Sequence, residues 1–217
     1  MLVLSIDTCS GLGTIALARL KDDEPEILGQ TELPGKTYSA QLTPAIRGLL
    51  NHHNVRLAEI ATIVVTNGPG SFTGIRIGLS TSKGLAEPGS IPILTVSRLA
   101  VLAHKAQSKT AALDASRHEF YFGDYSGPSP EESLLTAAQF VEIAGAHQLA
   151  ICEESILVTV PAATLVPPPT AADALRFALP RLRAHDYDNP LTLDGNYLRR
   201  SDAEIFSKPK SPASAAR

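Results

Sequence analysis

With 217 residues, of which 44% are hydrophobic and 19% charged, the chain has the composition of a globular protein of one large or two small domains. Its formal net charge of -3 argues against a protein that grips nucleic acid over a wide basic surface by itself. The two cysteines lie far apart in the sequence, which argues against a disulfide framework and favours a cytoplasmic protein. We expect no signal peptide, because no basic segment precedes the strand at Leu2, and no membrane helix, because no apolar run reaches roughly 18 residues.

The first half of the chain is predicted to open with three strands and then to alternate helices with strands. Short apolar or alternating runs predict strands at Leu2–Ile6, Thr14–Leu20, Glu26–Leu33, Ile63–Val65 and Ile91–Leu94. Apolar residues three and four apart predict helices at Ser39–Asn51, after a cap at Ser71, and from a cap at Ser97 to about Gln107. This order is typical of the α/β class.

The second half repeats part of that order. Strands are predicted at Ala111–Asp114, Glu119–Tyr125, Leu149–Cys152 and Ile156–Val160, and helices at Thr136–Gly145 and Ala171–Ala184. Each half begins with a strand that ends in an aspartate, Asp7 or Asp114. The repetition predicts an actin-like, internally duplicated fold with two subdomains at 1–107 and 108–206, each a mixed sheet flanked by helices. A disordered tail is predicted at 207–217.

A turn rich in glycine precedes the helix that Ser71 caps, and it raises the question of phosphate binding. A P-loop would need a lysine that is absent here, and the third glycine of a dinucleotide fingerprint would stand at position 73 rather than 74. Backbone amides at a helix N-terminus can still attract an anion. The hypothesis is a vestigial nucleotide or phosphate site, and the alternative is that Asp7 merely forms a turn. The residues of that site would be Asp7, Thr8, Gly68, Gly70 and Ser71.

Gly74, Gly78 and Ser82 form a stripe of small residues, spaced four apart, on that same helix. Each glycine is unfavourable by roughly 1 kcal/mol against alanine, so another backbone is expected to come close. Two alternatives remain open: packing on the chain's own sheet, or contact with another subunit. In the second case the interface would also take Gln41 and Ala45 from the preceding helix, and Gly78→Leu would abolish pairing while leaving the monomer folded.

The contiguous run NGPGSFTGIRIGLSTSKGLA at residues 67–86 resembles the signature of the bacterial TsaB (YeaZ) family, which serves in tRNA threonylcarbamoyladenosine biosynthesis. The resemblance runs from Ile6 to the segment 196–204; it departs at Tyr38, where the family commonly has histidine, and at 151–169. It implies an actin-like (ASKHA) fold and a cytoplasmic partner of a TsaD-like catalytic subunit, joined by a TsaE-like ATPase. The tRNA would then be bound only through the complex, no membrane would be involved, and the lone chain could form a homodimer.

The resemblance also bears on catalysis. In the paralogue TsaD, the helix similar to that after Ser97 carries two metal-binding histidines four residues apart, where this chain has Arg98 and Leu102. Neither side chain can ligate iron or zinc. The implied role is a non-catalytic pseudoenzyme subunit without metal or cofactor. The alternatives are a small actin-like ATPase or kinase, a metal-dependent glycopeptidase-like enzyme, and a structural homodimer joined along the glycine stripe.

Overall fold

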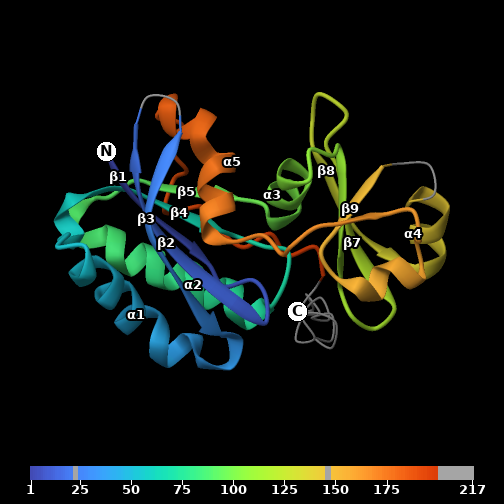
Figure 1. Cartoon of the computed structure of the whole chain (residues 1–217), viewed down its shortest axis with the longest axis horizontal. Helices are drawn as coiled ribbons and strands as arrows, with labels where there is room; N and C mark the ends of the chain where they lie inside the picture. The colour runs from blue at the N-terminus through green and yellow to red at the C-terminus, as the bar shows by residue number, and fades with distance from the viewer. Residues whose placement is uncertain (22–23, 145–147, 200–217) are drawn as a thin grey trace, which may run out of the picture.

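Two five-stranded mixed sheets organise the chain, which the computed structural model describes at residues 1–21, 24–144 and 148–199 (Figure 1). The first sheet has the order β3-β2-β1-β4-β5 and contains β1 (Leu2–Asp7), β2 (Leu12–Leu20), β3 (Pro25–Pro34), β4 (Ile60–Thr66) and β5 (Ile93–Val96). The second has the order β10-β9-β6-β7-β8 and contains β6 (Thr110–Asp114), β7 (Glu119–Asp124), β8 (Glu131–Thr136), β9 (Leu149–Ile151) and β10 (Thr164–Leu165).

The second sheet repeats the connectivity of the first. In each, the first three strands pair antiparallel, and the fourth strand joins the first in parallel, with the fifth parallel to the fourth. The predicted duplicated actin-like fold is confirmed by this repetition. Strands β1 and β4 read as nearly continuous apolar runs because helices cover both faces of the first sheet.

In the part of the chain that the structure describes, five α-helices cover the sheets: α1 (Tyr38–His52), α2 (Phe72–Ala86), α3 (Arg98–Lys105), α4 (Ala137–Ala144) and α5 (Ala171–Arg183). Helices α1 and α2 lie side by side on one face of the first sheet, and α5 covers the other face (Figure 1). Helix α3 packs on β6, β7 and β9, and α4 packs on β7 and β8. Among the described residues, no helix is both long and apolar enough to cross a membrane.

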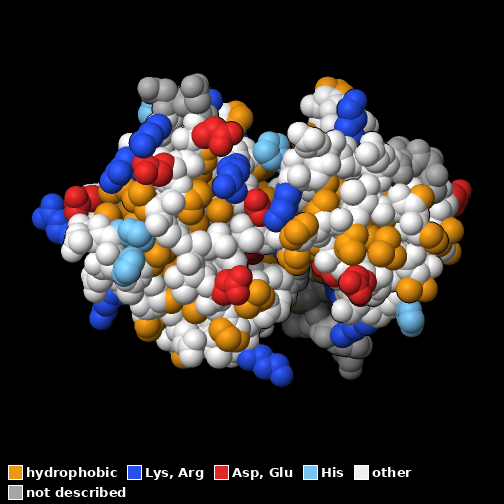
Figure 2. Space-filling model, in the orientation of Figure 1, with side chains coloured by type: hydrophobic (Ala, Val, Ile, Leu, Met, Phe, Trp, Pro, Cys, Tyr) orange, Lys and Arg blue, Asp and Glu red, His pale blue; other side chains and the backbone are white. Residues whose placement is uncertain are grey.

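The division predicted after residue 107 falls between the sheets, but it does not separate the helices. Helix α5 belongs to the second half of the sequence and packs on all five strands of the first sheet, while α3 packs on the second sheet. The two helices contact each other, and Lys105 Nζ lies 2.8 Å from Asp173 Oδ2 across that contact. Glu132 of β8 also accepts hydrogen bonds from Ser97, at the start of α3, and from Asn196. The two halves are therefore joined by several elements, and they are in contact in the space-filling view (Figure 2). The tail predicted at 207–217 lies outside the described residues.

Helix caps were predicted well. The Ser71 hydroxyl accepts a hydrogen bond from the Gly74 amide at 3.2 Å, so α2 begins where the sequence indicates. Thr170 and Asp173 form a reciprocal capping box at the start of α5. The Ser97 hydroxyl caps α3 by accepting a hydrogen bond from the Ala100 amide at 3.4 Å.

In the second half one prediction was wrong and one strand was missed. Residues 154–158 form a 3₁₀ helix rather than the strand predicted at Ile156–Val160, because Ile156 and Val160 are buried while Val158 is 87% exposed. A strand would place all three side chains on one face. Strand β8 was missed because it is a largely polar edge strand, in which only Leu135 is buried.

Candidate functional site

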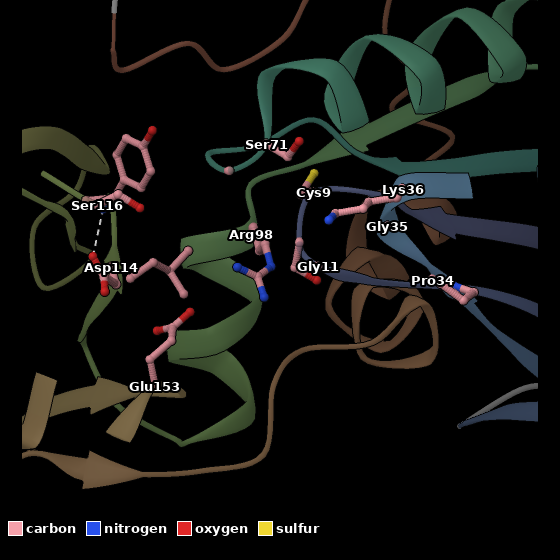
Figure 3. Close-up of a pocket in the computed structure, with 14 residues that line it drawn as sticks. Cys9, Gly11, Pro34, Gly35, Lys36, Ser71, Arg98, Asp114, Ser116 and Glu153 are labelled. Atoms are coloured by element: carbon pink, nitrogen blue, oxygen red, sulfur yellow. Dashed lines mark hydrogen bonds between the residues drawn. The ribbon is translucent and has the colours of Figure 1, made fainter. Parts of the chain in front are cut away.

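A cleft of about 740 Å³ lies where the two sheets approach each other. Segments far apart in the sequence line it, and they include the loop at residues 9–11 that follows β1 (Figure 3). Lys36 comes from the turn before α1, and Ser71 from the start of α2. Asp114 ends β6, and Glu153 follows β9. Arg98, the first residue of α3, reaches into the middle of the cleft toward the loop at residue 11.

Arg98 is the most unusual of these residues, because its charged side chain is only 5% exposed. Its Nε atom lies 4.0 Å from Asp7 Oδ2, and Nε has no hydrogen-bond partner among the described residues. The Asp7 carboxylate, itself buried, accepts a hydrogen bond from the Cys9 amide at 2.9 Å. Burial raises the pKa of Asp7, and the nearby Arg98 charge and the Cys9 amide only partly oppose that rise.

Glu153 places a second carboxylate in the cleft. Its Oε2 atom is buried and has no hydrogen-bond partner among the described residues. Burial raises the pKa of Glu153, and the Arg98 charge opposes the rise. Asp114 lies beside it and accepts hydrogen bonds from the Ser116 amide at 2.7 Å and the Ser155 hydroxyl at 3.3 Å. No three His, Cys, Asp or Glu side chains of the described residues are grouped so as to hold a metal ion.

The structure brings the predicted phosphate-site residues together only in part. Gly70 and Ser71 line the cleft, and Asp7 lies behind Arg98. Gly68 has a positive φ, as predicted, but it packs against Ile75 and does not line the cleft. Thr8 is fully buried and donates its hydroxyl hydrogen bond to the Gly74 carbonyl at 2.7 Å. Phosphate binding at these residues stays a prediction.

The glycine stripe on α2 faces the chain's own first sheet. Gly74, Gly78 and Ser82 are all buried. A Cβ atom on Gly74 would lie 2.0 Å from the Thr8 carbonyl oxygen, and one on Gly78 would lie 2.4 Å from Thr8 Oγ1. The close approach that the glycines permit is therefore made to the end of β1, within the chain. The prediction that these three residues form a subunit contact is corrected accordingly.

The outward faces of α1 and α2 form a separate surface. Arg47 on α1 and Ser80 and Gly84 on α2 are exposed, and a Cβ atom on Gly84 would meet no heavy atom within 4 Å. A smaller groove between the two helices is lined by Thr43 and Arg47 on α1 and by Leu85 on α2.

Gln41 and Ala45 of the predicted interface lie at the margin of this surface. Gln41 is exposed and Ala45 is half-buried. Thr43 and Arg47 lie on the edge of α1 that faces α2. Because successive residues of a helix are rotated by about 100°, Gln41 and Ala45 project from the opposite edge of α1. The contact of these two residues with another subunit stays a prediction.

The sequence analysis missed most of the cleft. Arg98 was interpreted only as a lost metal ligand, and Lys36, Asp114 and Glu153 were not singled out as a site. One signal was present: Arg98 is a cation in the first turn of a helix, where the helix dipole disfavours positive charge. Such a placement is informative because a nearby acid must compensate it, and here Asp7 does so.

Comparison with known proteins gives the family. Residues 31–174, more than half of the chain, match the family described as TsaD: tRNA N6-adenosine threonylcarbamoyltransferase. Two proteins named tRNA threonylcarbamoyladenosine biosynthesis protein TsaB are similar: one from Bacillus subtilis is 36% identical over 129 residues, and one from Haemophilus influenzae is 30% identical over 126 residues. The chain belongs to the TsaB (YeaZ) group of this family.

The TsaB-group match covers 58% of the chain and 55% of the Bacillus protein, and 55% of the chain and 52% of the Haemophilus protein. The chain thus spans about half the length of these relatives. A solved structure of a Pseudomonas aeruginosa protein described as similar to peptidase YeaZ is 25% identical, with a TM-score of 0.74, over 91% of this chain and 99% of that one. YeaZ from the same organism superimposes with a TM-score of 0.71 at 24% identity, over 90% and 100% of the chains. Both share the fold.

Proposed function

We propose that this chain takes part in forming threonylcarbamoyladenosine in tRNA, as a non-catalytic subunit that pairs with a TsaD-like catalytic protein. A TsaE-like ATPase joins the pair, and the tRNA is bound through the complex. The observation that carries the proposal is the family match at residues 31–174, together with the names of its TsaB-group relatives.

The chemistry of α3 supports a subunit without its own metal centre. Arg98 and Leu102 stand four residues apart on this helix, where two histidines would converge on a metal. Leu102 is fully buried in an apolar cluster, and Arg98 is held beside Asp7. An isobutyl group offers no ligand atom, and a guanidinium is permanently protonated.

The outward α1/α2 face is the surface we propose for the partner. The inner faces of α1 and α2 are buried on the first sheet, and α5, on the other side of that sheet, contacts α3. The outer faces carry small residues, among them Ser80 and Gly84, which let the backbone of another helix come close. Gln41 and Ala45 lie at the margin of this contact.

Gly84→Arg is expected to abolish capture of a TsaD-like partner from the same organism, whereas Gly84→Ala should retain it. Both changes replace an exposed helical glycine at a position with open space around it, so both should leave the monomer folded and slightly stabilised. Only the arginine is long enough to hold a partner helix away. The measurement is co-purification of the two proteins, with the melting temperature of each variant recorded alongside.

Ala138→Arg, on the exposed side of α4 in the second subdomain, is the matched control and should bind the partner like the unmodified chain. If Gly84→Arg captured the TsaD-like partner normally, the interface would have to lie elsewhere on the molecule. If no variant and no unmodified chain bound the TsaD-like protein, the proposed function itself would be wrong.

A further inference from the structure

The cleft between the two sheets has cationic groups on one side and carboxylates on the other. In Figure 3, Arg98 and Lys36 face the side that bears Asp114 and Glu153. Arg98 Nε and Glu153 Oε2 are both buried without a hydrogen-bond partner among the described residues. A buried polar atom left unpaired costs about 1–3 kcal/mol, and more when it is charged. Both residues also line the cleft, so a ligand bound there would meet one cationic and one anionic side chain whose hydrogen-bonding capacity is not fully used within the chain.

We propose that this cleft binds a small amphoteric molecule that carries both a carboxylate and an amino group, the chemistry of a free α-amino acid. The Arg98 guanidinium pairs with the ligand's carboxylate through charge-assisted hydrogen bonds. The start of α2 at Ser71 lies on the same cleft wall and adds the positive end of its dipole. The ligand's ammonium donates to Glu153, with Asp114 beside it.

The balance of charges favours this class over a simple anion or cation. A phosphate would bring multiple negative charges toward Glu153 and Asp114, with Asp7 close behind Arg98. A metal ion or a simple amine would have to approach the Arg98 guanidinium, which stands in the middle of the cleft. Only a ligand with one charge of each sign gains from both sides. This inference does not depend on the proposed partner subunit.

The test uses the full chain and a panel of free L-amino acids, with binding observed by ligand-detected NMR. Acetate, methylamine and inorganic phosphate are the comparison probes, and each of them carries charge of only one sign. At least one amino acid is expected to bind about tenfold more tightly than any of these three probes. Absence of binding by every amino acid would overturn the proposal, and so would acetate or phosphate binding as tightly as the best amino acid.

Variants of the cleft residues test whether the amino acid binds in the cleft. Glu153→Gln is nearly isosteric and should weaken the best amino acid by about tenfold, which corresponds to one lost charged contact. The pair Arg98→Met with Asp7→Asn removes the cation and its buried counter-charge together, and should abolish binding. Glu142→Gln on α4 and Arg176→Met on α5 lie outside the cleft lining and should bind like the unmodified chain. Unchanged affinity in Glu153→Gln would show that the ligand sits elsewhere, even if the double variant did not fold.

Discussion

Gly74→Ala is expected to lower the free energy of unfolding by about 3 kcal/mol or more, the upper end of what overpacking costs. The new Cβ would lie 2.0 Å from the carbonyl oxygen of Thr8, a backbone atom at the end of the central strand β1. A backbone atom in that position cannot rotate away as a side chain could, so α2 or β1 would have to shift. Urea unfolding of the purified chain measures the loss.

Gly84→Ala is the matched comparison, since it adds the same methyl group to the same helix. Its Cβ meets no heavy atom within 4 Å, so the change should stabilise the chain by about 1 kcal/mol through helix propensity alone. The propensity gain is common to both variants, and the difference between them reports the contact with Thr8. Similar stabilities for the two variants would contradict the packing of α2 against β1.

Gly78→Ala provides a further check, because its clash is with a side chain. The added Cβ would lie 2.4 Å from Thr8 Oγ1, while the next nearest atoms are 3.7 Å and 3.8 Å away, at ordinary contact distance. In a Thr8→Ala background, which lacks that hydroxyl, Gly78→Ala should therefore be tolerated. Gly74→Ala should stay destabilising there, since the Thr8 carbonyl remains.

The glycine stripe illustrates how far the sequence reaches. Two glycines four apart inside a helix predict a close neighbour, and the neighbour is present. The spacing identifies the face of the helix on which small residues allow a close approach, but it carries no information on what covers that face. Thr8 is 66 residues from Gly74, and their hydrogen bond depends on how β1 and α2 meet in the fold. The sequence therefore left two alternatives open, and the close approach of α2 to Thr8 decides between them.

The duplicated fold was predictable for a different reason. Strand order and helix caps are local signals, and the aspartates that end β1 and β6 mark the start of each repeat. The cleft is not local: Lys36, Arg98 and Glu153 come from three distant segments and share no spacing pattern. Only the unfavourable position of Arg98 at a helix start hinted that a buried acid lies opposite it.

Arg98→Met is expected to destabilise the chain at neutral pH by about 3–5 kcal/mol, the cost of leaving one member of a buried ion pair alone. Arg98 and Asp7 are both almost fully buried, and Arg98 Nε lies 4.0 Å from Asp7 Oδ2. Methionine fills much of the same volume without charge, so the loss reflects the stranded carboxylate rather than a large cavity. Unfolding in urea at about pH 8 measures it.

The pH dependence of that variant identifies the cause. Burial already raises the pKa of Asp7, and Arg98 is the main group that opposes the rise, so its removal raises the folded-state pKa further. The folded variant then holds a proton on Asp7 more tightly than the unfolded chain, whose aspartate titrates near about pH 4. The stabilising contribution of the protonated carboxyl is thus complete below about pH 4 and is lost as pH rises through the folded-state pKa.

Arg98→Met should accordingly recover stability relative to the unmodified chain when the pH falls from about 8 to about 5. Adding Asp7→Asn removes the titrating group, so the double variant should regain stability at about pH 8 and lose this pH dependence. A single variant whose deficit is the same at both pH values would point to lost packing of the arginine side chain. A double variant as unstable as the single one would do the same, because no carboxylate would then remain to be relieved.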